Sequence, residues 1–143
     1  MSSILYETDF YAWTQQTAEQ LQRGELGAID MAALIEEVID LGGRHKDQLE
    51  SRLMILIAHM LKWDYQPGKR SNSWRGSIRV QRTRIQRQLK KMPSLRSAVS
   101  EVIAEAYEDA IALAMEETSL PESTFPTLCP YTIPEIFDRD FLV

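Results

Sequence analysis

Apolar side chains recur with the spacing of an α-helix along most of this chain, and strand-like alternation is nearly absent. Residues three and four positions apart share one face of a helix, and an apolar face needs a packing partner. The period appears within residues 8–24, 30–41, 49–63, 73–92 and 95–119. The pattern predicts an all-α fold, a single-domain helical bundle of four to five helices over about 8–119.

Capping and helix-breaking residues set the expected helix ends. Thr8 or Asp9 can cap the first helix, Asp30 the second and Ser73 the one that follows the turn at Pro67. Inside the long apolar pattern, Gly42-Gly43 costs about 2 kcal/mol relative to two alanines, so we expect a break or kink there. The apolar stripes expected to be buried on the first two helices are Phe10, Trp13, Thr17 and Leu21, then Leu34, Val38 and Leu41.

The last 24 residues, 120–143, form an expected ordered C-terminal arm. Four prolines keep it mostly extended, and Thr132 with Glu135 predicts a capping box that opens one short helical turn. Between Leu120 and Leu142 the arm also holds nine large apolar side chains, too many for a solvated tail. We therefore expect one domain over residues 1–143, with the arm packed against the bundle.

Several classes of function lack their usual residues. Cys129 is the single cysteine, so neither a disulfide nor a cysteine metal cluster is expected. Neither His45 nor His59 has a carboxylate three residues before it, as a di-iron bundle would need. The N-terminus lacks the pattern of a secretion signal, and no apolar run is long enough for a membrane span. The sequence predicts a cytoplasmic protein without metal, cofactor or membrane contact.

Catalytic patterns are missing as well. There is no nucleophile elbow and no glycine-rich phosphate loop, and 21 acids offer no particular pair for acid–base work. No catalytic residue is assigned, and the sequence favours a protein that is not an enzyme. The remaining enzyme or small-anion alternative is a candidate pocket at His59, Trp63 and Tyr65.

The charges are strongly segregated. Residues 65–100 hold ten Lys or Arg and no acid, whereas the rest of the chain holds all 21 acids and six bases. Such a segment must pair with the acidic regions or bind an anion. Aromatic residues interleave with the bases at its start, as in proteins that bind single-stranded nucleic acid. The candidate contacts for an anion or a nucleic acid are Lys62, Arg70, Trp74, Arg75, Arg79 and Arg82.

Two functions compete for this basic segment. The whole chain is acidic, with a net charge of −5, which is unusual for a nucleic-acid module. Acidic side chains at 36–40 and 101–109 can neutralise a packed basic helix. The preferred interpretation is therefore a non-catalytic interaction module whose basic helix pairs with acidic helices of itself or of a protein partner, including a homo-oligomer. The alternative is nucleic-acid binding through helix 73–92 and the aromatic turn 62–75.

Several strings, taken together, resemble one family over nearly the whole chain. They are Glu7-Thr8-Asp9-Phe10-Tyr11-Ala12-Trp13, Leu34-Ile35-Glu36-Glu37, His59-Met60-Leu61-Lys62-Trp63, Tyr65-Gln66-Pro67, Arg70-Ser71-Asn72-Ser73-Trp74, Ala104-Glu105-Ala106-Tyr107-Glu108-Asp109-Ala110 and Cys129-Pro130-Tyr131. This set is similar to the bacterial domain-of-unknown-function family numbered twenty-nine. The resemblance implies a small, mostly helical bacterial protein of unknown function, and it brings no activity or site residue.

Overall fold

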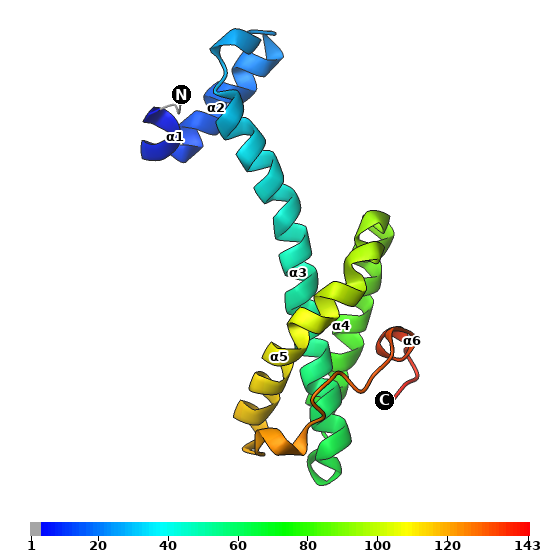
Figure 1. Ribbon diagram of the computed structural model, residues 1–143. Helices are drawn as coiled ribbons and strands as arrows, with labels where there is room; N and C mark the ends of the chain where they lie inside the picture. The colour runs from blue at the N-terminus through cyan, green and yellow to red at the C-terminus, as the bar shows by residue number, and fades with distance from the viewer. Residues whose placement is uncertain (1–3) are drawn as a thin grey trace. The chain divides into compact units, whose positions relative to one another are not determined.

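Helices supply all the regular structure in the computed structural model, which describes residues 4–143, and no strand occurs in that range. Four helices are long and two have five residues each (Figure 1). The α-helices are α1 (Ile4–Thr8), α2 (Phe10–Gln22), α3 (Met31–Tyr65), α4 (Asn72–Lys91), α5 (Val99–Thr118) and α6 (Ile133–Phe137). The predicted all-α bundle is confirmed.

The chain divides into two compact units, Met1–His45 and Lys46–Val143. In the first unit, Asp9 caps α2 as predicted, because its carboxylate accepts the backbone N–H of Ala12 at 3.1 Å. The helix ends before Gly24, whose φ of +73° turns the chain in a conformation that favours glycine. The Tyr6 hydroxyl donates to the Glu37 carboxylate and so links α1 to α3. The expectation of one domain over residues 1–143 stays a prediction.

Helix α3 is continuous from Met31 to Tyr65, so the predicted break at Gly42-Gly43 is wrong. Glycine weakens a helix, but it removes no backbone hydrogen bond, and 33 other residues of α3 sustain the ladder. The predicted cap is confirmed, since the Asp30 carboxylate accepts the Ala33 N–H at 3.1 Å.

The predicted buried stripes of the first unit are only partly right. Trp13 and Thr17 are buried, whereas Phe10, Leu21, Val38 and Leu41 are exposed. A unit with few helices buries only the residues between those helices, and the flanking apolar residues stay in solvent.

The second unit contains the main core. The C-terminal part of α3, α4 and α5 lie side by side, and the arm crosses them (Figure 1). Ser71, not the predicted Ser73, caps α4: its hydroxyl accepts the Trp74 N–H at 3.2 Å. The residues with no exposed surface include Leu53, Leu56, Ile57, Met60 and Leu61 of α3, Ile78 and Ile85 of α4, and Val102, Ala106 and Ala110 of α5.

The C-terminal arm is ordered and packed, as predicted. Phe125, Tyr131 and Ile136 are buried in the core of the second unit. The capping box of α6 is present, with Thr132 and Glu135 each accepting the other's backbone N–H. The arm therefore belongs to the fold and also reaches α4, where most candidate anion contacts lie.

Candidate functional site

The turn between α3 and α4 gathers cations around two tryptophans. Trp63 ends the buried face of α3, and two guanidinium groups lie over its ring: Arg70 at 5.0 Å and Arg75 at 5.4 Å from the ring centre. The Nε of Arg70 also donates to the backbone carbonyl of Trp63 at 2.8 Å. Cations at these distances are attracted by the negative face of the ring. The predicted interleaving of bases and aromatics is thus a set of contacts within the protein.

Lys62, a second predicted anion contact, is engaged by its own fold. Its side chain is buried, and its Nζ lies 2.5 Å from a carboxylate oxygen of Glu117 on α5. The same nitrogen lies 4.8 Å from the centre of the Trp74 ring, and Trp74 itself is half-buried. The contacts of Lys62 link α3 to α4 and α5, and an ammonium that is buried beside a carboxylate has little left to offer a ligand.

A hollow of about 490 Å³ opens beside Trp63. Arg70, Ser71, Asn72 and Arg75 line it together with Trp63. Arg70 and Arg75 are exposed residues, so this corner of the turn is positively charged and open to solvent. It is the part of the predicted site that keeps accessible cations close together.

The candidate pocket at His59, Trp63 and Tyr65 stays a prediction. In the structure, His59 and Tyr65 contact different neighbours. The Nδ1 of His59 lies 2.8 Å from the Ile55 carbonyl oxygen one turn earlier, and burial lowers the pKa of the imidazole. Tyr65 meets Phe125 of the arm edge to face at 5.6 Å. Each of these side chains has a packing role of its own.

Arg82 is the most deeply buried of the predicted anion contacts, with 1% of its surface exposed. It donates to three backbone carbonyls of the C-terminal arm: Nε to Ile136 at 2.8 Å, Nη1 to Phe141 at 2.8 Å and Nη2 to Glu135 at 3.2 Å. Burial lowers the pKa of the guanidinium, and the charge of Asp138 opposes that shift. Arg82 therefore holds the arm on α4.

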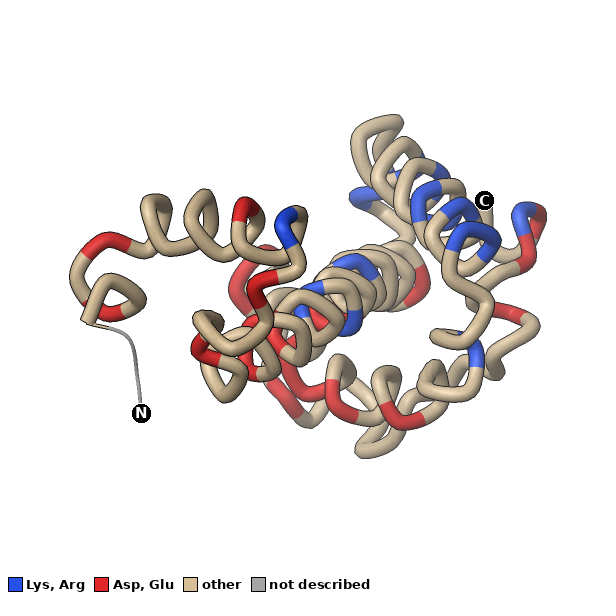
Figure 2. Tube along the Cα trace, turned by 90° about the horizontal axis from the view of Figure 1, so that it is seen from above, with Lys and Arg blue, Asp and Glu red and all other residues tan. Residues whose placement is uncertain are grey.

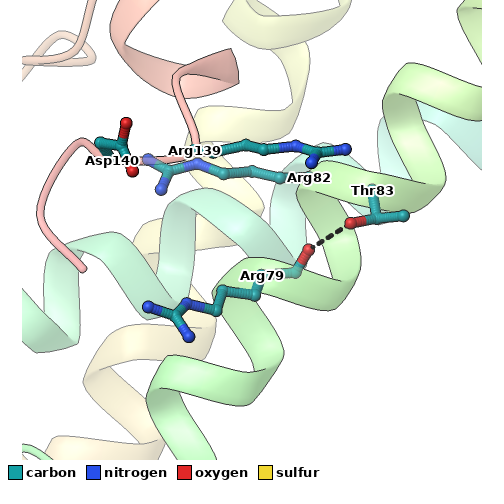
Figure 3. Close-up of a pocket in the computed structure, with 5 residues that line it drawn as sticks. All are labelled: Arg79, Arg82, Thr83, Arg139 and Asp140. Carbon is teal, nitrogen blue, oxygen red and sulfur yellow. Dashed lines mark hydrogen bonds between the residues drawn. The ribbon is translucent and has the colours of Figure 1, made fainter.

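A cavity of about 260 Å³ lies next to Arg82. Arg79, Thr83, Arg139 and Asp140 line it with Arg82 (Figure 3). Figure 3 shows the Arg82 and Arg139 side chains lying alongside each other in opposite directions, while Arg79 points away from both. The guanidinium groups do not converge on one point, so the cavity is no ready-made oxyanion site. Sequence reasoning missed Arg139, because no local signal places a residue of the arm beside α4.

The other cations of α4 are exposed, and together we call them the α4 basic face. Arg84, Arg87 and Lys91 lie opposite the buried residues of the helix, whereas Arg75, Arg79 and Lys90 lie toward one edge of that side. No acidic residue interrupts the basic residues along α4 (Figure 2). Within residues 4–143, no carboxylate lies within 4.0 Å of any of them; the ion pairs there are Arg23–Glu19, Lys46–Glu101 and Lys62–Glu117. The members of the face are Arg75, Arg79, Arg84, Arg87, Lys90 and Lys91.

Other chemistry finds little support in the described residues. In that part of the chain, no three His, Cys, Asp or Glu side chains form a group that could hold a metal ion. Cys129 is half-buried, its thiol donates to the Tyr131 carbonyl at 3.6 Å, and burial raises the thiol pKa, so the unreactive protonated form is favoured. No helix between residues 4 and 143 is both long enough and apolar enough to cross a membrane.

The chain matches the family model described as "Domain of unknown function DUF29" over residues 5–142, and it belongs to that family. No curated protein and no solved structure matches it. The predicted resemblance is confirmed. The family's description supplies no activity, so the function has to be argued from the surface of this molecule.

Proposed function

We propose that this member of the family is a non-catalytic interaction module that binds an acidic surface of a protein partner through the α4 basic face. The observation that carries the proposal is the set of six exposed cations on one helix with no carboxylate beside them in the described chain. Pairing of the basic helix within its own fold was one of the options that the sequence left open, and these cations make no such pair. The proposal keeps the cytoplasmic setting that the sequence predicts.

The arrangement of like charges supports an anionic partner. Six cations on one side of a 20-residue helix repel one another, and a partner carboxylate beside each pair relieves that repulsion. The free energy per exposed pair is small, about 0–1 kcal/mol, so the face has to act through several pairs at once. Arginine and lysine stems also cover apolar surface on a partner while their charged ends pair with its acids.

Nucleic-acid binding is the second candidate, and the open hollow at Arg70 and Arg75 favours it. Base stacking needs free aromatic faces, however, and the protein's own cations lie over the rings here. Trp63 is 6% exposed beneath two guanidinium groups, and Lys62 lies over Trp74. The turn can contact phosphates but offers no stacking platform, so an acidic protein surface fits the geometry better.

The test compares two variants that lose the same number of charges. One removes four cations of the α4 basic face: Arg79→Gln, Arg84→Gln, Arg87→Gln and Lys91→Gln. The matched control removes four exposed cations elsewhere: Arg23→Gln, Arg44→Gln, Lys69→Gln and Arg96→Gln. Fluorescence anisotropy follows the binding of a labelled polyglutamate peptide and of a labelled single-stranded RNA at about 150 mM salt.

We expect polyglutamate to bind the wild type and the control alike, and to bind the α4 variant about tenfold more weakly, as the loss of several exposed ion pairs predicts. RNA should bind all three more weakly than about micromolar. Equal binding of polyglutamate by both variants would refute the proposal. RNA binding tighter than about micromolar, lost in the α4 variant alone, would establish the nucleic-acid function in its place.

A further inference from the structure

The first unit exposes most of the large apolar side chains that lie in solvent. We call α1, α2 and α3 as far as His45 the hairpin. Val80, Leu128 and Ile133 of the second unit are exposed. The corresponding hairpin residues are Ile4, Phe10, Tyr11, Leu21, Leu26, Met31, Ile35, Val38, Ile39 and Leu41. An apolar surface of this extent on one small unit marks an interaction site.

Four of these residues lie on one face of α3. Met31, Ile35, Val38 and Ile39 have the spacing i, i+4, i+7 and i+8, which places them in one stripe along the helix. Their exposed fractions run from 44% to 67%. A stripe with this spacing is what one helix presents to another helix that packs against it.

The charge of the hairpin narrows the choice of partner. Residues 1–45 hold eight acids against two bases, a net charge of −6. Glu36 and Asp40 are exposed on α3; Glu36 flanks the apolar stripe, and Asp40 lies further around the helix, toward the side of Ala33. A second hairpin is a poor partner, because two surfaces of charge −6 repel each other. The complementary surface must combine cations with apolar atoms.

The α4 basic face has that combination. Val80 is 46% exposed in the middle of it, and Arg84, Arg87 and Lys91 lie on the same side at i+4, i+7 and i+11. Their alkyl stems can cover the apolar stripe of α3 while a charged end pairs with Glu36 at its flank, and Asp40 adds to the negative charge of the hairpin. We infer that the hairpin of one copy docks on the α4 basic face of a second copy. This inference rests on the proposed function and names the acidic partner.

Each copy has one hairpin and one α4 basic face, so a second copy offers the complement of both surfaces. A homodimer related by a two-fold axis is the smallest assembly that pairs all four surfaces. The result is a homodimer in which two apolar stripes leave solvent and two acidic surfaces meet two basic ones. It accounts for both features that the single chain leaves unpartnered.

Charge reversal tests the contact from both sides. A hairpin variant carries Glu36→Arg with Asp40→Arg, and an α4 variant carries Arg84→Glu with Arg87→Glu. A control carries Glu116→Arg with Glu122→Arg, two exposed acids outside the hairpin. Sedimentation velocity over a concentration series reports the dimer fraction, and far-UV circular dichroism verifies that each variant keeps its helices.

We expect the wild type and the control to dimerise, and each reversed variant alone to dimerise at least about tenfold more weakly, as a few lost ion pairs replaced by repulsion predict. An equimolar mixture of the hairpin and α4 variants should recover the dimer, because each reversed surface then meets its complement. A second hairpin variant, Ile35→Gln with Ile39→Gln, should also weaken the dimer without changing any charge.

Three results would overturn the inference. They are a wild type that stays monomeric at about 100 µM, far above the Kd of a specific interface; a dimer that survives reversal of α4; and a mixture of reversed variants that stays monomeric. These failures are distinct from failure of the proposed function. If the wild type is monomeric but binds polyglutamate through α4, the homodimer is refuted and the proposed function stands. If polyglutamate binding does not depend on the cations of α4, the proposed function is refuted.

Discussion

Arg82 shows how differently two arginines on one helix can act. Arg79, one turn earlier, is exposed on the α4 basic face, whereas Arg82 is buried and its guanidinium donates to three carbonyls of the arm. The planar, multi-donor shape of arginine makes such a contact possible, and a lysine cannot reproduce it. Their positions on the helix decide the difference, because residue 82 lies on the side that the arm covers.

Replacement of Arg82 by Gln should lower the free energy of unfolding by about 2–4 kcal/mol, because carbonyl groups buried by the arm lose their donors. Arg82→Lys should recover little of that loss. Arg79→Gln is the matched control and should cost less than about 0.5 kcal/mol. Urea denaturation measures all three, and an Arg82→Gln protein as stable as the control would mean that the arm is held by other contacts.

His59 predicts a dependence of stability on pH. Burial is the main cause that lowers its pKa in the folded protein, and the nearby Lys62 charge acts in the same direction. The unfolded chain therefore binds more protons than the folded chain below about pH 6.5, so stability from this residue falls as the pH drops through that value. His59→Gln should lose less stability between about pH 7 and pH 5.5 than the wild type.

The comparison variant is His45→Gln, which removes the other histidine of the chain and keeps His59. Thermal unfolding at a series of pH values measures the difference. If His59→Gln and the wild type lose stability in parallel, the imidazole takes no part in the acid dependence.

Helix α3 is the element in which local propensity and structure disagree most. Gly42-Gly43 lies inside it, and a Cβ added at either position meets no atom within 4 Å. The helix bears the cost of both glycines, since the long hydrogen-bond ladder on either side sustains it. Propensity alone therefore misplaces a boundary that cooperativity keeps helical.

Gly43→Ala should raise the free energy of unfolding by about 1 kcal/mol, because alanine loses less backbone entropy in a helix and finds open space here. Gly24→Ala is the contrasting variant: the φ of +73° at that position makes alanine strained, so stability should fall. Chemical denaturation compares the two. A loss of stability in Gly43→Ala would show that the helix bends at this point.

The arm is the second element whose role can be measured. Ile136 has no exposed surface and Ile133, one turn earlier in α6, is 39% exposed. Ile136→Ala should cost about 2–5 kcal/mol through the lost burial and the cavity, whereas Ile133→Ala should cost well under half of that. Equal, small losses in both variants would mean that the arm contributes no core.

Elements that depend on local signals could be predicted from the sequence, and contacts between distant residues could not. Caps at Asp9, Asp30 and Thr132 follow from the residues next to them, and all three are confirmed. The sequence predicts the cap of α4 at Ser73, two residues after the actual cap Ser71, because the two serines are equally good caps in sequence. The contacts of Arg82 with the arm join residues more than fifty positions apart, so no local sequence pattern predicts them.

At the scale of the whole molecule, the sequence shows that basic and acidic residues are segregated, but it does not show which cations are exposed and which are buried. Helical spacing placed Arg75, Arg79 and Arg82 together, and only the structure separates the exposed pair from the buried anchor. The sequence of the aromatic turn likewise predicts a stacking platform, whereas in the structure Trp63 and Trp74 lie beneath cations of the same chain. Phe10, Leu21, Val38 and Leu41 of the hairpin are exposed, although periodicity predicts them to be buried. Periodicity identifies an apolar face without identifying what covers it.

The central claim is that the α4 basic face binds an acidic surface of a protein partner. The salt dependence of polyglutamate binding tests this claim most directly. The dissociation constant should be measured for the wild type and for the variant lacking Arg79, Arg84, Arg87 and Lys91 between about 50 and 300 mM salt, where screening changes strongly. The account predicts that binding to the wild type weakens steeply with salt and that binding to the variant is weak and almost independent of salt. The same steep dependence in both proteins would contradict the claim, because the binding charges would then lie elsewhere.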